Sequence, residues 1–298
     1  MKNAESEKST IRVIVHSFFV VPFLIAAFGV LIFFIWSLLT YESKSIEEYI
    51  IDIKVGGATK RWQSAYELSR LLNDKDQYPI SDRFANEMLS AYEYALLDPN
   101  TQVRQYLIRA MGQTKDLRFL ETIKSAIDQD NENVIADAVY ALSFYNEYSN
   151  VNIISKLIFN SSSLVRNRVA VALGEMPKTS GTFALKDLLN DTEPNVRWNA
   201  AISLAKHGDS SGKNEILNLL DRDYLDKFES IDRYEKEQVL MIAVKISPLL
   251  NDKDIDKAVL LISQKDDNLK LRDEAMNCLL YTSPSPRDRT RSRMPSSA

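Results

Sequence analysis

Apolar positions recur along this chain with a period of 31 residues. Val103, Val134, Val165 and Val196 are each 31 apart, and apolar or small side chains follow each valine at offsets of 4, 7 and 8 residues. These offsets place side chains on one face of a helix. A period of this length predicts an array of stacked units, none of which can bury its apolar face alone.

Each unit is predicted to contain two helices. The second run of apolar residues keeps the same period, at Ile123, Ile154, Leu185 and Ile216. Turns rich in Asp, Asn and Ser precede the valines and suit helix caps, and Pro99 and Pro194 suit helix starts. Gly112 and Gly174 are expected to end the first helices in a left-handed conformation. The pattern therefore predicts an all-α fold.

The array extends beyond these four units. Arg61-Trp62 parallels Arg197-Trp198, so an earlier unit begins near residue 58. After Leu220 the register fails, and a charged insertion at 221–237 precedes further helical runs. We expect a solenoid of about six units and part of a seventh over 58–277.

A different pattern occupies the N-terminal region. No charged residue occurs from Val13 to Leu39, a run that reaches about 40 Å as a helix, whereas the hydrocarbon core of a bilayer measures about 30 Å. Trp36 and Tyr41 suit a membrane interface. The pattern predicts an N-terminal tail at 1–12, a transmembrane helix at 13–40 and a linker at 41–57, most flexible at Gly56-Gly57.

Two questions about this helix stay open in the sequence. A signal peptide cleaved after Ala26-Ala27 is the alternative, but it leaves a mostly apolar stub, and an uncleaved anchor fits better. Lys2, Lys8 and Arg12 precede the helix, and basic residues favour the cytoplasm. We therefore expect a single-pass protein of the cell membrane with an extracytoplasmic solenoid.

The last residues, 278–298, resemble a translated sequencing adapter, with a natural basic Ser/Pro-rich tail as the alternative. A translated adapter is not part of the native protein, so we expect the solenoid to be truncated at residue 277. The segment holds the only cysteine, Cys278, together with four arginines and one aspartate, so the rest of the chain has a formal charge of −7 instead of −4. Disulfides, zinc–cysteine sites and thiol catalysis are therefore excluded for residues 1–277.

The turns and first helices carry a family resemblance. An Asp or Asn turn, then Val-Arg, helically spaced alanines and Leu-Gly, clearest at 191–204 and 165–174, resembles bacterial HEAT repeats of the short class similar to phycobilisome-lyase HEAT-like repeats. The resemblance implies an armadillo-type α-solenoid of helix pairs. It also implies that five residues brace adjacent units rather than bind phosphate: Asp98, Arg104, Arg166, Asp191 and Arg197. Ile135 interrupts this series.

Candidate chemistry is sparse. His16 lies at the membrane edge and His207 precedes Gly208 at a helix end, so the two histidines have no metal-ligand spacing. The sequence has no glycine-rich phosphate loop and no basic cluster for nucleic acid. We expect no catalytic, cofactor or metal site and no enzymatic activity.

The remaining candidates are aromatic residues that suit protein binding: Trp62, Trp198, Tyr224, Phe228 and Tyr234. Instead of binding a partner, the two tryptophans could pack between adjacent units. The insertion at 221–237 could likewise be only a solvated loop or a longer helix. We expect a membrane-anchored scaffold or adaptor for unidentified protein partners. A lyase-like or hydrolase enzyme is the alternative, and it requires polar side chains that converge in the concave groove. The residues expected to be structural are Val103, Arg104, Val134, Val165, Arg166, Val196 and Arg197.

Overall fold

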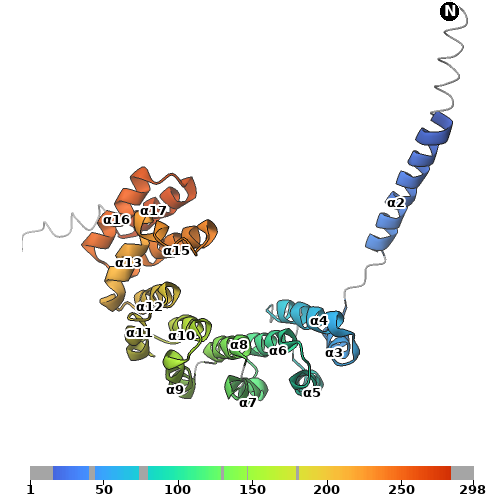
Figure 1. Cartoon of the computed structure of the whole chain (residues 1–298), viewed down its shortest axis with the longest axis horizontal. Coiled ribbons are helices and arrows are strands. Elements are labelled where there is room, and N and C mark those ends of the chain that lie inside the picture. Colours follow the sequence, from blue (N-terminus) through green and yellow to red (C-terminus); the bar gives the residue numbers. More distant parts are fainter. Residues whose placement is uncertain are drawn as a thin grey trace, which may run out of the picture. The chain divides into compact units, whose positions relative to one another are not determined.

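The computed structural model describes residues 16–39, 44–73, 80–128, 131–145, 147–178 and 181–282. The chain divides into two compact units, Met1–Ser45 and Ile46–Ala298. The described residues of both units form helices and turns without a strand, which confirms the predicted all-α fold (Figure 1).

The first unit contains one long apolar helix. A short π-helical turn, His16–Val20, leads into α2, Val21–Leu39. The stretch Phe18–Leu38 has a mean hydropathy of 2.9 over 21 residues, and none of it is buried. At about 1.5 Å per residue this length matches the hydrocarbon core of a bilayer. The expected apolar helix is therefore present, whereas the tail at 1–12 and Tyr41 lie outside the described residues.

The second unit is built from helix pairs. The first helices of the pairs are α4 (Ala58–Leu71), α6 (Thr101–Thr114), α8 (Glu132–Ser143), α10 (Ser163–Glu175), α12 (Pro194–Lys206), α15 (Arg233–Ile246) and α17 (Leu269–Thr282). The second helices are α5 (Asp82–Leu96), α7 (Leu120–Ser125), α9 (Tyr148–Ser155), α11 (Thr182–Leu188), α13 (Lys213–Leu219) and α16 (Lys253–Lys265). Short 3-10 turns flank several of these, at Leu117–Phe119, Ala126–Asp128, Lys156–Phe159, Ser210–Gly212 and Ser247–Leu249.

The first helices from α4 to α12 follow one another in one row, with α5, α7, α9 and α11 in a second row (Figure 1). Each of these first helices packs on the first helix of the next pair. The four valines that define the 31-residue period are all buried in the core between the rows: Val103, Val134, Val165 and Val196. Since each pair buries its apolar face on its neighbours, the core continues from pair to pair.

Two glycines set the distance between first helices. A Cβ built on Gly112 lies 2.5 Å from the Cβ of Ala141, and one on Gly174 lies 2.2 Å from Oγ of Ser203. Both glycines are inside helices, so the expectation that they end helices in a left-handed conformation is wrong. After α6 that conformation belongs to Lys115, with φ 53°. The glycines instead let α6 approach α8 and α10 approach α12.

The expected linker at 41–57 contains a further helix. Helix α3, Ile46–Val55, buries Ile46, Ile50 and Ile53 and packs on α4 and α5. The carbonyl of Gly56 accepts a hydrogen bond of 3.0 Å from Arg61 Nη1. The solenoid therefore begins at Ile46 rather than at residue 58, and Gly56 is part of a fixed connection between α3 and α4.

The other predicted boundaries also shift. Within the insertion at 221–237, Arg222–Asp226 forms helix α14, and α15 already begins at Arg233. Helix α17 continues past residue 277 to Thr282, so no break in the structure marks the predicted end of the solenoid. Residues 283–298 lie outside the described part of the chain.

Candidate functional site

Arginine occupies the fourth position of most first helices, and at two of these positions, Arg61 and Arg166, it links neighbouring pairs. Arg166 on α10 donates from Nε and Nη2 to the carboxylate of Asp191, at 2.6 and 2.9 Å. Its Nη1 donates to the carbonyls of Asn160 and Ser161, at 2.8 and 3.1 Å. Only 13% and 7% of the Arg166 and Asp191 side chains are exposed. The hydrogen bond from Arg166 lowers the pKa of Asp191.

The same arrangement recurs with variations. Arg61 pairs with Asp98 at 2.6 Å. Arg197 pairs with Glu215 at 3.1 Å rather than with an aspartate of the following turn, and it also donates to the carbonyl of Asp191 at 2.8 Å. Arg104 differs, since its Nε is buried without a hydrogen-bond partner. The geometry thus gives ion pairs between units to Arg166, Asp98 and Asp191, an ion pair within its own helix pair to Arg197, and no ion pair with a described residue to Arg104.

In the insertion, Arg222 makes a similar bracing contact although it lies outside the 31-residue period. Lys236 holds the fourth position of α15, and Arg222 on α14 takes the bracing position instead. Arg222 donates to both carboxylate oxygens of Asp266, at 2.6 and 2.9 Å, and to both of Glu237, at 2.7 and 3.1 Å. These two acids raise the pKa of Arg222. Part of the insertion therefore serves the architecture.

The aromatic residues of the insertion pack inward on α12. Phe228 lies edge-on to Trp198, with ring centroids 5.1 Å apart, and Tyr224 contacts both rings. Trp198 is only 1% exposed, so it packs between elements and presents no surface to a partner. Of the five aromatic candidates, Trp62 is half-buried and Tyr234 stands apart at 74% exposure. The structure brings together Trp198, Tyr224 and Phe228 and leaves Trp62 and Tyr234 separate.

Two shallow pockets lie beside the braces. The larger, about 420 Å³, is lined by Phe159, Arg166, Asp187, Asp191 and neighbouring residues. A second, about 180 Å³, includes Arg61 and Asp98 at the equivalent place in the first pair. Asp191 and Asp98 are already bound by arginine, and the pKa of each is lowered. A carboxylate held in this way is a poor general base near neutral pH.

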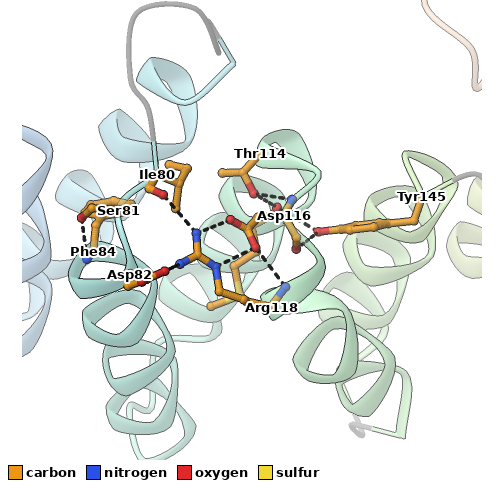
Figure 2. Close-up of polar contacts among 9 residues, drawn as sticks. Ile80, Ser81, Asp82, Phe84, Thr114, Asp116, Arg118 and Tyr145 are labelled. Carbon is orange, nitrogen blue, oxygen red and sulfur yellow. Dashed lines mark hydrogen bonds and ion pairs between the residues drawn. The ribbon is translucent and has the colours of Figure 1, made fainter.

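A polar cluster that the sequence analysis missed joins three consecutive pairs (Figure 2). Arg118, in the turn before α7, contacts the carboxylates of Asp82 and Asp116 and donates to the carbonyl of Ile80 at 3.0 Å. The hydroxyl of Tyr145, which follows α8, donates to the carbonyl of Asp116 at 3.0 Å. Burial raises the pKa of Tyr145, so this hydroxyl stays protonated. The cluster is a structural link between second helices.

A largely half-buried row of aromatic and charged side chains crosses the first helices. We call it the first-helix row: Tyr66, Tyr106, Arg109, Asp137, Tyr140 and Arg168. Tyr66 on α4 lies edge-on to Tyr106 on α6, at 5.2 Å between ring centroids. Arg109 sits over the Tyr106 ring at 5.5 Å and bonds to Asp137 on α8 at 2.9 Å. Arg168 on α10 sits over the Tyr140 ring at 5.1 Å.

Sequence reasoning missed this row because it compared the apolar positions, the turns and the fourth-position arginines of the units, and did not compare the polar face of the first helices. Tyr106 and Arg168 are the sixth residues of their helices, and Tyr66, Arg109 and Tyr140 are the ninth. Positions six and nine are three apart and share a helix face, so a search for helical spacing on the polar side finds them.

Metal and histidine chemistry finds no support in the described residues. No group of three or more His, Cys, Asp or Glu among them could hold a metal ion. Both ring nitrogens of His207 are buried without a hydrogen-bond partner, and burial lowers its pKa. His16 lies in the first unit, at the start of the apolar helix.

Comparisons with known proteins agree on the fold. Residues 151–231 match the family model for HEAT repeats. The complex of CpcE and CpcF of phycocyanin lyase from Nostoc sp. PCC7120 is similar in structure, with a TM-score of 0.53 and 12% identity over 82% of this chain and 97% of that one. No curated protein matches the sequence.

Two further solved structures are similar. The archaeal HEAT-like repeats protein from Thermococcus onnurineus NA1 is 14% identical, with a TM-score of 0.44 over 81% of this chain and 98% of that one. A designed armadillo repeat protein is 12% identical, with a TM-score of 0.40 over 80% of this chain and the whole of that one. The family match and the helix pairs identify the second unit as an α-solenoid of HEAT repeats.

Proposed function

We propose that this protein is a membrane-anchored scaffold that binds a protein partner on its solenoid. The observation that carries the proposal is the first-helix row, in which Tyr and Arg side chains are held in fixed positions across four helices. Tyr and Arg are over-represented among residues that dominate binding energy. Fixed side chains lose little conformational freedom when a partner binds, which favours affinity.

The apolar helix α2 supports anchoring in the cell membrane. A tethered solenoid meets other membrane-associated proteins at a raised effective concentration. We further propose that the N-terminal tail faces the cytoplasm and that the solenoid lies outside it. A reporter that is active only in the cytoplasm, fused after Asn277, is expected to stay inactive, and its activity would reverse this orientation.

We infer that the solenoid binds rather than catalyses. The support is that Asp98 and Asp191, beside the two pockets, are engaged by arginine. The lyase-like or hydrolase alternative needs unpaired polar groups that converge in one pocket. The similarity to the phycocyanin lyase complex concerns the fold and assigns no activity to this chain.

Site-specific photo-crosslinking in native membranes tests the scaffold proposal. Benzoyl-phenylalanine replaces Tyr106 or Tyr140 in the row, and Phe183 on α11 serves as an exposed control outside the row. We expect the same protein adduct from positions 106 and 140, identified by mass spectrometry, and none from position 183. If both row positions yield no protein adduct, the scaffold proposal is wrong.

A further inference from the structure

We propose that the first-helix row recognises an acidic, extended polypeptide segment, whose carboxylates pair with Arg168 and Arg109 while an apolar side chain between them packs on the Tyr140 ring. This inference rests on the proposed scaffold function and specifies the chemistry of the partner.

Arg168 is the main determinant. Its guanidinium lies over the Tyr140 ring and makes no ion pair with a described residue. Stacking fixes the plane of the guanidinium, and its forked donors match the two oxygens of a carboxylate. A half-buried arginine that is positioned but unpaired therefore offers a ready carboxylate site.

The charges around Arg168 favour an anionic ligand. The acids on α8 and α10 already have partners: Glu132 contacts Ser162, Asp137 bonds to Arg109, and Glu175 pairs with Lys206. Asp137 is also only 5% exposed. Lys115, at the end of α6, lies over the Phe144 ring at 5.9 Å and makes no ion pair with a described residue. The row itself thus carries two arginines against one aspartate, although the whole chain has a formal charge of −4.

The spacing of the row matches an extended chain. Arg109 and Arg168 are on α6 and α10, two helices apart. Arg109 reaches Asp137 on α8 and Arg168 lies over Tyr140 on α8, so the two guanidiniums flank the helix between them. Neighbouring helices pack with axes about 8–10 Å apart, which separates the two guanidiniums by roughly 8–10 Å. An extended chain advances about 3.3 Å per residue, which sets the two carboxylates about three residues apart. Tyr140 on α8 lies between them and offers its ring to an intervening apolar side chain, and the Tyr106 ring lies beneath Arg109.

A protein segment suits this surface better than a nucleic acid does. Phosphate polymers require several cations that act together, and affinity grows with the number of phosphates neutralised. The row offers two arginines, one of which already bonds to Asp137. Two carboxylates with an apolar residue between them fit two guanidiniums with the Tyr140 ring between them.

Fluorescence anisotropy on the full chain in detergent micelles tests the inference. The probe is a fluorescein-labelled peptide with two glutamates about three residues apart, separated by leucines. Its counterpart has glutamine at both positions. We expect the glutamate peptide to bind about tenfold more tightly, and Arg168→Gln to remove most of that preference. Arg168→Lys keeps the charge but not the fork, and is expected to retain only part of the preference.

Arg83→Gln is the matched control, because Arg83 is an exposed arginine on α5, outside the row. It changes the net charge equally and is expected to leave peptide binding unchanged. Circular dichroism establishes that each variant is folded. Equal binding of the two peptides, equal losses in the two Gln variants, or tighter binding of a single-stranded oligonucleotide would each overturn the inference. Protein adducts at positions 106 and 140 without a glutamate preference would refute the acidic partner and leave the scaffold function standing.

Discussion

At the scale of single residues, the braces between helix pairs combine charge with burial. Arg166 and Asp191 are both largely shielded from water, and each satisfies hydrogen-bonding groups of the other. Removing one member of such a pair leaves the other charge buried and unpaired. The free-energy cost of that unpaired charge exceeds the net stabilisation that the intact pair contributes.

Asp191→Ala is therefore expected to lower the free energy of unfolding by about 3 kcal/mol. Glu121→Ala is the control, since Glu121 pairs with Lys124 on the surface of α7, and we expect a change of about 0.5 kcal/mol or less. Urea unfolding of the full chain in micelles, followed by circular dichroism, measures both. Similar losses in the two variants would show that the brace adds nothing beyond a surface pair.

The same aspartate predicts a dependence of stability on pH. The hydrogen bond from Arg166 lowers the pKa of Asp191 below its ordinary value of 3.8. The resulting stabilisation is complete above the unfolded-state pKa, shrinks as the pH falls below about 3.8, and vanishes once the pH passes the lowered pKa. The difference in unfolding free energy between wild type and Asp191→Asn is expected to decrease over that window. A difference that stays constant from pH 6 to about pH 2 would contradict the linkage.

At the scale of helices, glycine controls how closely neighbouring pairs pack. A Cβ at position 112 lies 2.8 Å from the Cα of Ala141, so Gly112→Ala forces α6 and α8 apart. We expect a loss of about 1–3 kcal/mol in the free energy of unfolding. Gly57→Ala is the control, because a Cβ there meets nothing within 4 Å. Capping and chain-entropy effects oppose each other at position 57, so its change is expected to stay below about 1 kcal/mol.

The 31-residue period predicted the first and second helices because the same face is buried in every pair. It could not predict elements outside the period. Helix α3 was missed although Ile46, Ile50 and Ile53 have helical spacing, since the segment lies outside the 31-residue period and Gly56-Gly57 favoured a linker. The sequence allowed Trp198 either to pack between elements or to bind a partner. Its contact with Phe228 in the structure shows that it packs. Helical spacing places the residues of the first-helix row on one face of each helix, but the contacts between helices that join them into a row come only from the structure.

The insertion offers a test of this aromatic packing. Phe228→Ala removes the ring that lies edge-on to Trp198 and is expected to loosen α14, because a paired aromatic contributes about 0.5–1.5 kcal/mol beyond its buried area. Hydrogen–deuterium exchange should become about fivefold faster in Arg222–Asp226, with no change in α6 or α8. Tyr234→Ala removes an exposed aromatic from the same segment and is expected to change nothing. Unchanged exchange in both variants would mean that Phe228 does not hold α14.

At the scale of the whole molecule, the two units carry different solubility requirements. The second unit buries its apolar positions on neighbouring helix pairs, whereas the apolar stretch Phe18–Leu38 has none of its residues buried. An exposed apolar surface of that length is stable in hydrocarbon and costly in water. The anchor should therefore determine where the chain resides, and the solenoid should fold without it.

Removal of residues 1–44 tests both statements together. The full chain is expected to remain in the membrane pellet after extraction at alkaline pH, because a spanning helix is held by hydrocarbon rather than by charge. The truncated chain, which begins at Ser45 just before α3, is expected to appear in the soluble fraction with unchanged helical circular dichroism. Extraction of the full chain, or retention of the truncated one, would contradict the assignment of α2 as the anchor. A soluble but unfolded truncated chain would show instead that the solenoid depends on the first unit.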